Sequence, residues 1–317
     1  MPSRTNQGAR RRVCVGTAFM SHFSAMRFAA CALVACAALA IAMPSAAQRA
    51  YPSAEAASQA LVDAISRVDE IALRDVLGAN WRSFVPTGSM GREDVDAFLA
   101  AWKKQHRIVR GAAGESLLEV GEAGWTLPVP LVEKAGNQWQ FDPRAGALIM
   151  RERRVGRNEM AAVQAALAYY DAQKEYALHD HDGNGVLEYA QKFVSSPGRH
   201  DGLYWPAGSA QEQSPLGPLY VSQAPGTGYH GYRFKILKAQ GGAATGGAYR
   251  YVIGGRMRSG FALVAWPVAY GETGLETFIV SHEGVVYQKD LGPRTGTAAA
   301  AMEVFNPDSS WRKANVP

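Results

Sequence analysis

Cysteine is nearly absent from this sequence of 317 residues. The three cysteines, Cys14, Cys31 and Cys36, all precede residue 37. If the first 47 residues are removed as a leader, no thiol remains, which excludes a disulfide framework, a thiolate metal site and a cysteine nucleophile. In an oxidising compartment such a chain depends on its hydrophobic core for stability.

An excess of basic charge is also missing once the leader is set aside. The formal charge is +5, but five arginines lie in the first 47 residues, which hold no Asp or Glu. The rest of the chain carries 28 basic and 28 acidic residues. Such a balance lacks the broad positive field that holds nucleic acid, so we expect no nucleic-acid partner.

The first 47 residues have the pattern of a cleaved export signal. Arg27 precedes an apolar run at residues 28–43, and Pro44 is followed by small residues at 45–47. This order predicts cleavage after Ala47 and a mature chain that starts at Gln48. The apolar run is short for a membrane span. We therefore expect a periplasmic or secreted protein without a transmembrane anchor after cleavage, with Met26 as an alternative start.

A second interpretation of the leader is lipidation. Residues 33–36, Leu-Val-Ala-Cys, resemble the lipobox of bacterial lipoproteins, in which the cysteine becomes the lipid-bearing first residue. Residues 37–43 would then follow the lipid as an apolar run, where a polar tether is usual. A lipid anchor on Cys36 thus stays open as the alternative.

The composition and periodicity after the leader predict an α+β fold in two domains. In the first domain, residues 48–150, helices are expected at about 53–68, 69–77 and 92–106, followed by strands at 116–120, 125–132 and 138–141. Ser53 is the expected cap of the first helix. This order of helices before a small antiparallel sheet resembles the nuclear-transport-factor-like fold.

The second domain, residues 158–317, is expected after a basic linker at residues 151–157. Asn158 could cap a long helix that ends near His179. A Gly- and Pro-rich region then leads to strands at about 229–237, 248–253, 260–265, 277–280 and 285–288. The pattern predicts a long helix packed on an antiparallel sheet.

Six stretches of the sequence carry a resemblance to a known family. They are residues 125–131, 154–159, 201–206, 214–218, 260–267 and 287–293. Together they resemble a proteobacterial family of exported proteins that is known only as a domain of unknown function. The resemblance implies export and no particular activity. The second domain is also similar to the globular part of type II pseudopilins, although the apolar N-terminal helix of pilins does not directly precede it.

The strongest chemical motif is an acidic loop at residues 180–188. Asp180, Asp182 and Asn184 alternate at relative positions 1, 3 and 5, and Gly185 stands at position 6, as in loops that wrap calcium. The carbonyl of Val186 and the carboxylate of Glu188 could supply further ligands. Position 12 is Gln191 instead of a bidentate Glu. Calcium is therefore the one expected cofactor, and a solvated Asp-Gly turn is the alternative.

Other motifs favour packing or solvation over chemistry. His179 and His181 could give a nitrogen-rich zinc site, but a flanking solvated role is more typical. The text Gly-x-Gly-x-x-Gly at residues 226–231 lacks the preceding strand and following helix of a dinucleotide site. Trp205 and Trp266 could line a glycan or peptide groove, or close the core.

These observations favour a non-enzymatic envelope protein that binds or assembles with an envelope protein or a glycan. An alternative from another class is a hydrolase of cell-wall or surface glycan. Such an enzyme would use paired carboxylates, with Glu188, Glu272 and Asp290 as candidates, and it needs a defined separation between them. No catalytic residue is assigned by the sequence.

Overall fold

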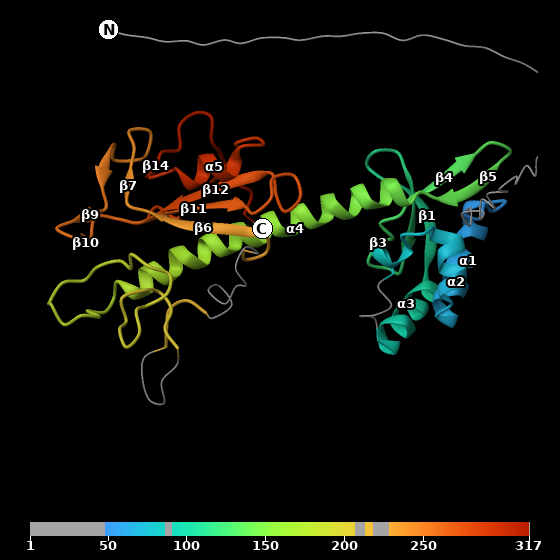
Figure 1. The fold of residues 1–317 in the computed structure, drawn as a ribbon, viewed down its shortest axis with the longest axis horizontal. Helices are drawn as coiled ribbons and strands as arrows, with labels where there is room; N and C mark the ends of the chain where they lie inside the picture. Colours follow the sequence, from blue (N-terminus) through green and yellow to red (C-terminus); the bar gives the residue numbers. More distant parts are fainter. Residues whose placement is uncertain (1–47, 86–90, 207–212, 218–227, 317) are drawn as a thin grey trace, which may run out of the picture. The chain divides into compact units, whose positions relative to one another are not determined.

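The computed structural model describes residues 48–85, 91–206, 213–217 and 228–316. The leader, its cleavage site and Cys36 lie outside the described residues. The described chain has helices and several mainly antiparallel sheets, which confirms the α+β class (Figure 1). No helix in these ranges has the length and apolar character that a membrane crossing requires.

The first three helices form where the sequence predicts them. Helix α1 (Ala54–Arg67) begins after Ser53, whose side chain accepts a hydrogen bond from the Ala56 amide at 3.1 Å. Helix α2 (Glu70–Leu77) is capped by Asp69 and ends at Gly78, and helix α3 (Arg92–Lys104) follows a short 3-10 helix, η1 (Trp81–Ser83). The apolar faces of α1 and α2 meet in the core of this part of the chain.

The sheet of the N-terminal part has the order β1-β2-β4-β5. Its strands are β1 (His106–Arg110), β2 (Ser116–Val120), β4 (Leu131–Lys134) and β5 (Gln138–Phe141), and β3 (Trp125–Thr126) also pairs with β2. The single strand predicted at 125–132 is in fact divided, because Pro128 and Pro130 cannot donate ladder hydrogen bonds. Strand β1 was not predicted.

Helix α4 (Pro143–Tyr176) differs from the expectation for this region. It starts at Pro143 and not after Asn158, and the expected linker at residues 151–157 is helical throughout. The Asp142 carboxylate accepts hydrogen bonds from the amides of Arg144 (2.9 Å) and Ala145 (3.1 Å), and proline suits the first helical position. The prediction failed because a run of arginines was interpreted as a linker, although arginine is a good helix former.

The sheet of the C-terminal part has the antiparallel order β15-β13-β12-β11-β6. Its strands are β6 (Tyr232–Leu237), β11 (Ala262–Pro267), β12 (Glu276–Ser281), β13 (Val286–Asp290) and β15 (Arg312–Lys313). Every residue of β11 is buried, because β11 lies between β12 and β6 and contacts both helix α4 and the short helix α5 (Thr295–Ala300) (Figure 1). The hairpin predicted to end in residues 285–288 is present as β12 and β13.

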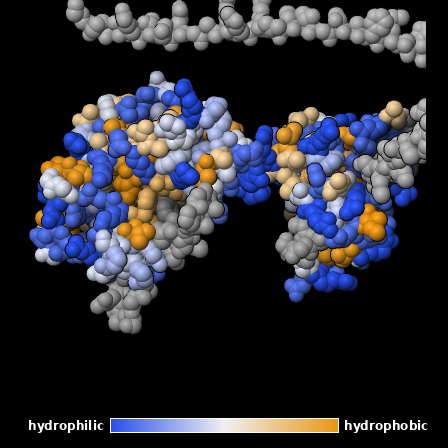
Figure 2. Space-filling view, viewed as in Figure 1, coloured by the Kyte–Doolittle hydropathy of each residue, from blue (hydrophilic) through white to orange (hydrophobic). Residues whose placement is uncertain are grey.

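Smaller elements complete this part of the chain. They are β7 (Ala239–Gln240), β8 (Tyr249–Arg250), β9 (Val252–Ile253), β10 (Arg256–Met257), α5 (Thr295–Ala300) and β14 (Val304–Phe305). Most of the buried hydrophobic residues fall into two clusters that share no member, one within residues 51–141 and one within residues 162–305. On the face drawn in Figure 2, hydrophobic residues appear as scattered patches among hydrophilic ones.

Candidate functional site: the acidic loop after helix α4

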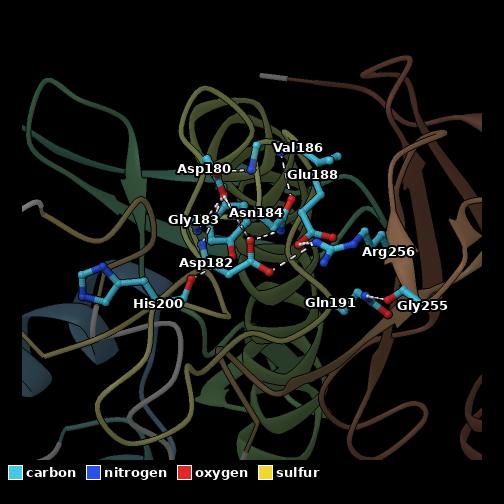
Figure 3. Close-up of polar contacts among 12 residues, drawn as sticks. Asp180, Asp182, Gly183, Asn184, Val186, Glu188, Gln191, His200, Gly255 and Arg256 are labelled. Atoms are coloured by element: carbon cyan, nitrogen blue, oxygen red, sulfur yellow. Dashed lines mark hydrogen bonds and ion pairs between the residues drawn. The ribbon is translucent and has the colours of Figure 1, made fainter.

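The acidic loop, residues 180–188, is folded around the carboxylate of Asp180 (Figure 3). One oxygen accepts hydrogen bonds from the amides of Asp182, Gly183 and Asn184 at 3.0–3.3 Å, and the other accepts one from Gly185 at 2.7 Å. The bond from the Gly185 amide is the main cause that lowers the pKa of Asp180. The Asp180 carboxylate thus stays ionised and fixes the path of the next five residues.

Two glycines allow this tight path. Gly183 and Gly185 have φ values of 69° and 79°, in the left-handed region that residues with a side chain rarely adopt. Asp182 accepts a hydrogen bond from the Asn184 amide, and Asn184 accepts one from the Val186 amide at 2.9 Å. Each short oxygen side chain therefore turns the backbone two residues ahead of it.

The carboxylates of Asp182 and Glu188 converge on one guanidinium nitrogen. Nη1 of Arg256, in β10, lies 3.3 Å from Oδ2 of Asp182 and 3.2 Å from Oε1 of Glu188. Burial raises the pKa of Glu188, and the charges of Asp182 and Asp180 raise it further, whereas Arg256 opposes them. The region thus has a negative potential that Arg256 partly neutralises, with a smaller contribution from Arg258.

Buried contacts hold the chain directly after the loop. Gln173, on the inner face of α4, is fully buried and donates to the Ala190 carbonyl and accepts from the Ala190 amide, both at 2.8 Å. The Tyr189 amide donates to the Met257 carbonyl at 2.7 Å. The acidic loop therefore begins after α4 and ends at a segment bonded to both α4 and β10.

Gln173 and Arg256 were missed by the sequence reasoning. Gln173 follows Tyr169 by four residues and precedes Tyr176 by three, so it is a polar residue within an apolar helical stripe. That mismatch is a signal for a buried hydrogen-bonding role. Arg256 gives no such signal, because its partner Glu188 lies 68 residues earlier in the sequence.

The predicted ligands are only partly brought together. Asp182 and Glu188 share Arg256, whereas the Asp180 carboxylate is bonded to loop amides. Over the ranges that the structure describes, no group of three or more His, Cys, Asp or Glu side chains is placed so that one metal ion could contact them all.

The two histidines beside the loop belong to an aromatic cluster. The His181 ring stacks on Tyr176 at 4.0 Å, and its Nε2 donates to the Tyr176 carbonyl at 3.0 Å. His179 lies edge-on to His181, with 6.1 Å between ring centroids, and Trp205 lies edge-on to it at 5.7 Å. His181 therefore has an aromatic environment.

The other candidate residues have partners of their own. Glu272 pairs with Arg151 and Arg154, and Asp290 accepts from the Tyr270 hydroxyl at 3.1 Å. Trp205 and Trp266 are 5 % and 7 % exposed and belong to the core, which supports the packing interpretation for these two rings.

In the Gly-rich motif at residues 226–231, only the part from Gly228 onward belongs to the described residues. Gly231 leads into strand β6, where the dinucleotide fingerprint requires a helix. The described part of the motif therefore lacks the helix N-terminus that binds a pyrophosphate.

The fold and the loop together define an α+β protein with an acidic, glycine-containing loop that follows helix α4 in the sequence. Residues 48–314 match the family described as "Protein of unknown function (DUF2950)", and the chain belongs to that family. This confirms the resemblance to a domain of unknown function. No curated protein and no solved structure gives a significant match, and the likeness to pseudopilins is not confirmed.

Proposed function

We propose that this chain is an exported envelope protein without catalytic activity, a binding or assembly module whose acidic loop takes up a structural calcium ion. Export to the periplasm or beyond is supported by the leader sequence. The calcium role is supported above all by the path of the loop. Asp180, Asp182 and Asn184 alternate along a turn that contains two left-handed glycines, which is how calcium loops bring oxygen atoms around an ion.

Calcium uptake would change the ion pairs that Arg256 makes with the loop. Without an ion, its guanidinium is the cation that faces Asp182 and Glu188. A calcium ion needs six to eight oxygen ligands at short distance, so both carboxylates would turn from Arg256 toward the ion. This exchange of one cation for another costs part of the binding energy and favours modest affinity.

The absence of a carboxylate at position 12 of the loop also favours a modest affinity for calcium. Gln191 stands at that position, and its side-chain amide donates to the Gly255 carbonyl at 2.8 Å. We therefore expect a dissociation constant on the order of 10⁻⁴–10⁻³ M, the range of extracellular modules. Such a site is filled where calcium is plentiful, and its role is to stabilise the folded chain.

Thermal unfolding with and without calcium tests the proposal. With a dissociation constant near 10⁻³ M, 10 mM calcium adds about 1.4 kcal/mol by mass action, which raises the melting temperature by roughly 3–5 °C. Magnesium should give a smaller rise, because it demands stricter geometry. Asp182→Ala should abolish the calcium effect.

Asp308→Ala is the matched control, because Asp308 is an exposed aspartate that also accepts from a backbone amide two residues ahead, that of Ser310. It should leave the calcium effect intact. An unchanged melting temperature for the wild-type protein in 10 mM calcium would contradict the proposal and reduce the loop to a solvated turn.

A further inference from the structure

Strand β1 forms one edge of the N-terminal sheet. It pairs with β2 along its whole length, from His106 opposite Val120 to Arg110 opposite Ser116. Backbone hydrogen bonds from Gly121 to Gln105 and from Gly111 to Glu115, both 2.8 Å, flank this ladder. Since antiparallel pairing alternates, the odd-numbered residues bond to β2. The amides and carbonyls of His106, Ile108 and Arg110 therefore point to the outer edge.

This outer edge has no backbone partner within the described residues. No described strand lies next to β1 on that side, and no loop amide or carbonyl bonds to His106, Ile108 or Arg110. An open row of donors and acceptors is a template for another extended chain. At the other edge of the sheet, by contrast, β5 is covered by Tyr51, whose backbone exchanges two 2.7 Å hydrogen bonds with Trp139.

A cleft of about 550 Å³ runs beside β1. It is lined by Ile108, Leu118, His106 and Arg107 of the sheet, by Trp102 of α3, and by a mainly polar stretch of α1 that includes Glu55 and Gln59. The His106 ring stacks on Trp102 at 3.7 Å, and its Nδ1 donates to the Trp102 carbonyl at 2.9 Å. The cleft therefore has a fixed wall next to the open strand edge.

The positive charge along the edge of β1 favours an acidic partner. Lys103, Lys104, Arg107 and Arg110 place four positive charges within eight residues, and all four are exposed. Glu119, on β2, pairs with Arg107 at 2.6 Å. Two copies of β1 paired with each other would place like charges across from one another, which is unfavourable. An acidic strand would have the opposite charge.

We propose that the open edge of β1 is a docking site for an extended, acidic peptide segment of a partner protein, which adds a strand to the sheet. Its backbone bonds to His106, Ile108 and Arg110. Its alternate side chains enter the cleft, and its carboxylates lie near the basic residues. Main-chain bonds supply affinity and the cleft supplies selectivity, as in other cases of strand addition. The inference extends the binding role proposed above but uses none of the residues of the acidic loop, so calcium results do not decide it.

A synthetic eight-residue peptide of alternating Glu and Val, labelled with fluorescein, tests the proposal by fluorescence anisotropy on the purified protein. We expect saturable binding of this peptide and none of its Lys-Val counterpart. Every second amide of the peptide can be N-methylated in two ways, which we call the two methylation registers. One register should abolish binding and the other should leave it within about twofold, because only one of the two sets of amides faces β1.

Two protein variants and one spectroscopic measurement complete the test. Arg110→Glu should weaken binding roughly fivefold or more at low salt, whereas Lys134→Glu, an exposed residue of β4, should change it less than about twofold. The amides of His106, Ile108 and Arg110 should exchange with solvent quickly in the free protein and become protected with peptide. Equal effects of the two methylation registers, equal binding of the Lys-Val peptide, or no binding of the Glu-Val peptide at millimolar concentration would overturn the proposal.

Discussion

Replacement of Gln173 by leucine should destabilise the protein strongly, although it changes only one side chain. Gln173 is fully buried, and its amide group makes two 2.8 Å hydrogen bonds to Ala190 and one of 3.0 Å to the Tyr169 hydroxyl. Leucine has a similar volume, so it leaves no large cavity. It cannot bond to the Ala190 amide and carbonyl, which remain buried because Ala190 is only 2 % exposed.

The expected magnitude follows from these two groups. A buried donor or acceptor without a partner costs about 1–3 kcal/mol. The hydroxyl of Tyr169 still donates to the Ala262 carbonyl at 3.3 Å, so it adds little. With two orphaned groups, and a small gain from the more apolar side chain, the free energy of unfolding should fall by about 3 kcal/mol. For a unit of this size the melting temperature should drop by roughly 6–12 °C.

Urea unfolding, followed by circular dichroism, measures this loss. Gln191→Leu is the matched control, since the Gln191 side chain also bonds to a backbone carbonyl but belongs to a solvent-accessible segment. It should cost less than about 1 kcal/mol. If Gln173→Leu were within 1 kcal/mol of wild type, or no worse than the control, the buried amide of Gln173 would not hold the segment after the acidic loop.

Two further predictions concern the segment that contains Asp201. Hydrogen bonds from the Lys192 side chain, at 2.7 Å, and from the amide and hydroxyl of Ser196 lower the pKa of Asp201 to about 2 from its ordinary value of 3.8. Because the pKa of Asp201 is depressed in the folded state, the ionised carboxylate stabilises the protein above its ordinary pKa, and this stability is lost as pH falls from about 4 to 2. The urea midpoints of wild type and Asp201→Asn should therefore converge over that range. A difference that stays constant with pH would contradict this prediction. Gly202→Ala should cost about 1–3 kcal/mol in urea unfolding, because its Cβ would lie 2.7 Å from the backbone carbon of Val194. Gly242→Ala, where the space is open, should be neutral, and equal costs for the two variants would refute the packing argument.

Much of the fold follows from local sequence signals. Ser53 caps α1 and Gly78 ends α2, because capping side chains and left-handed glycines act within a few residues of the chain. The buried strands β11 and β12 overlap the strand-like runs predicted at residues 260–265 and 277–280. Local signals of this kind suffice to predict helices whose capping residues lie next to them in the sequence and strands whose two faces are both buried.

The missed features depend on contacts that sequence patterns do not encode. Strand β1 has no fully buried residue, because it lies at a sheet edge, so its apolar alternation is weak. Arg256 was not found because it meets Asp182 and Glu188 only after the β9–β10 hairpin folds against the loop. The motif at residues 180–188 was predictable, but the internal cation that competes for its carboxylates was not.

A crystal structure grown in millimolar calcium would test the central proposal most directly. We expect an anomalous peak within 2.3–2.6 Å of oxygen atoms of Asp180, Asp182, Asn184, Val186 and Glu188. In that structure the Arg256 guanidinium should have moved from the two carboxylates that it now contacts. A loop without a peak in the presence of calcium, with Arg256 still paired to Asp182 and Glu188, would contradict the proposal.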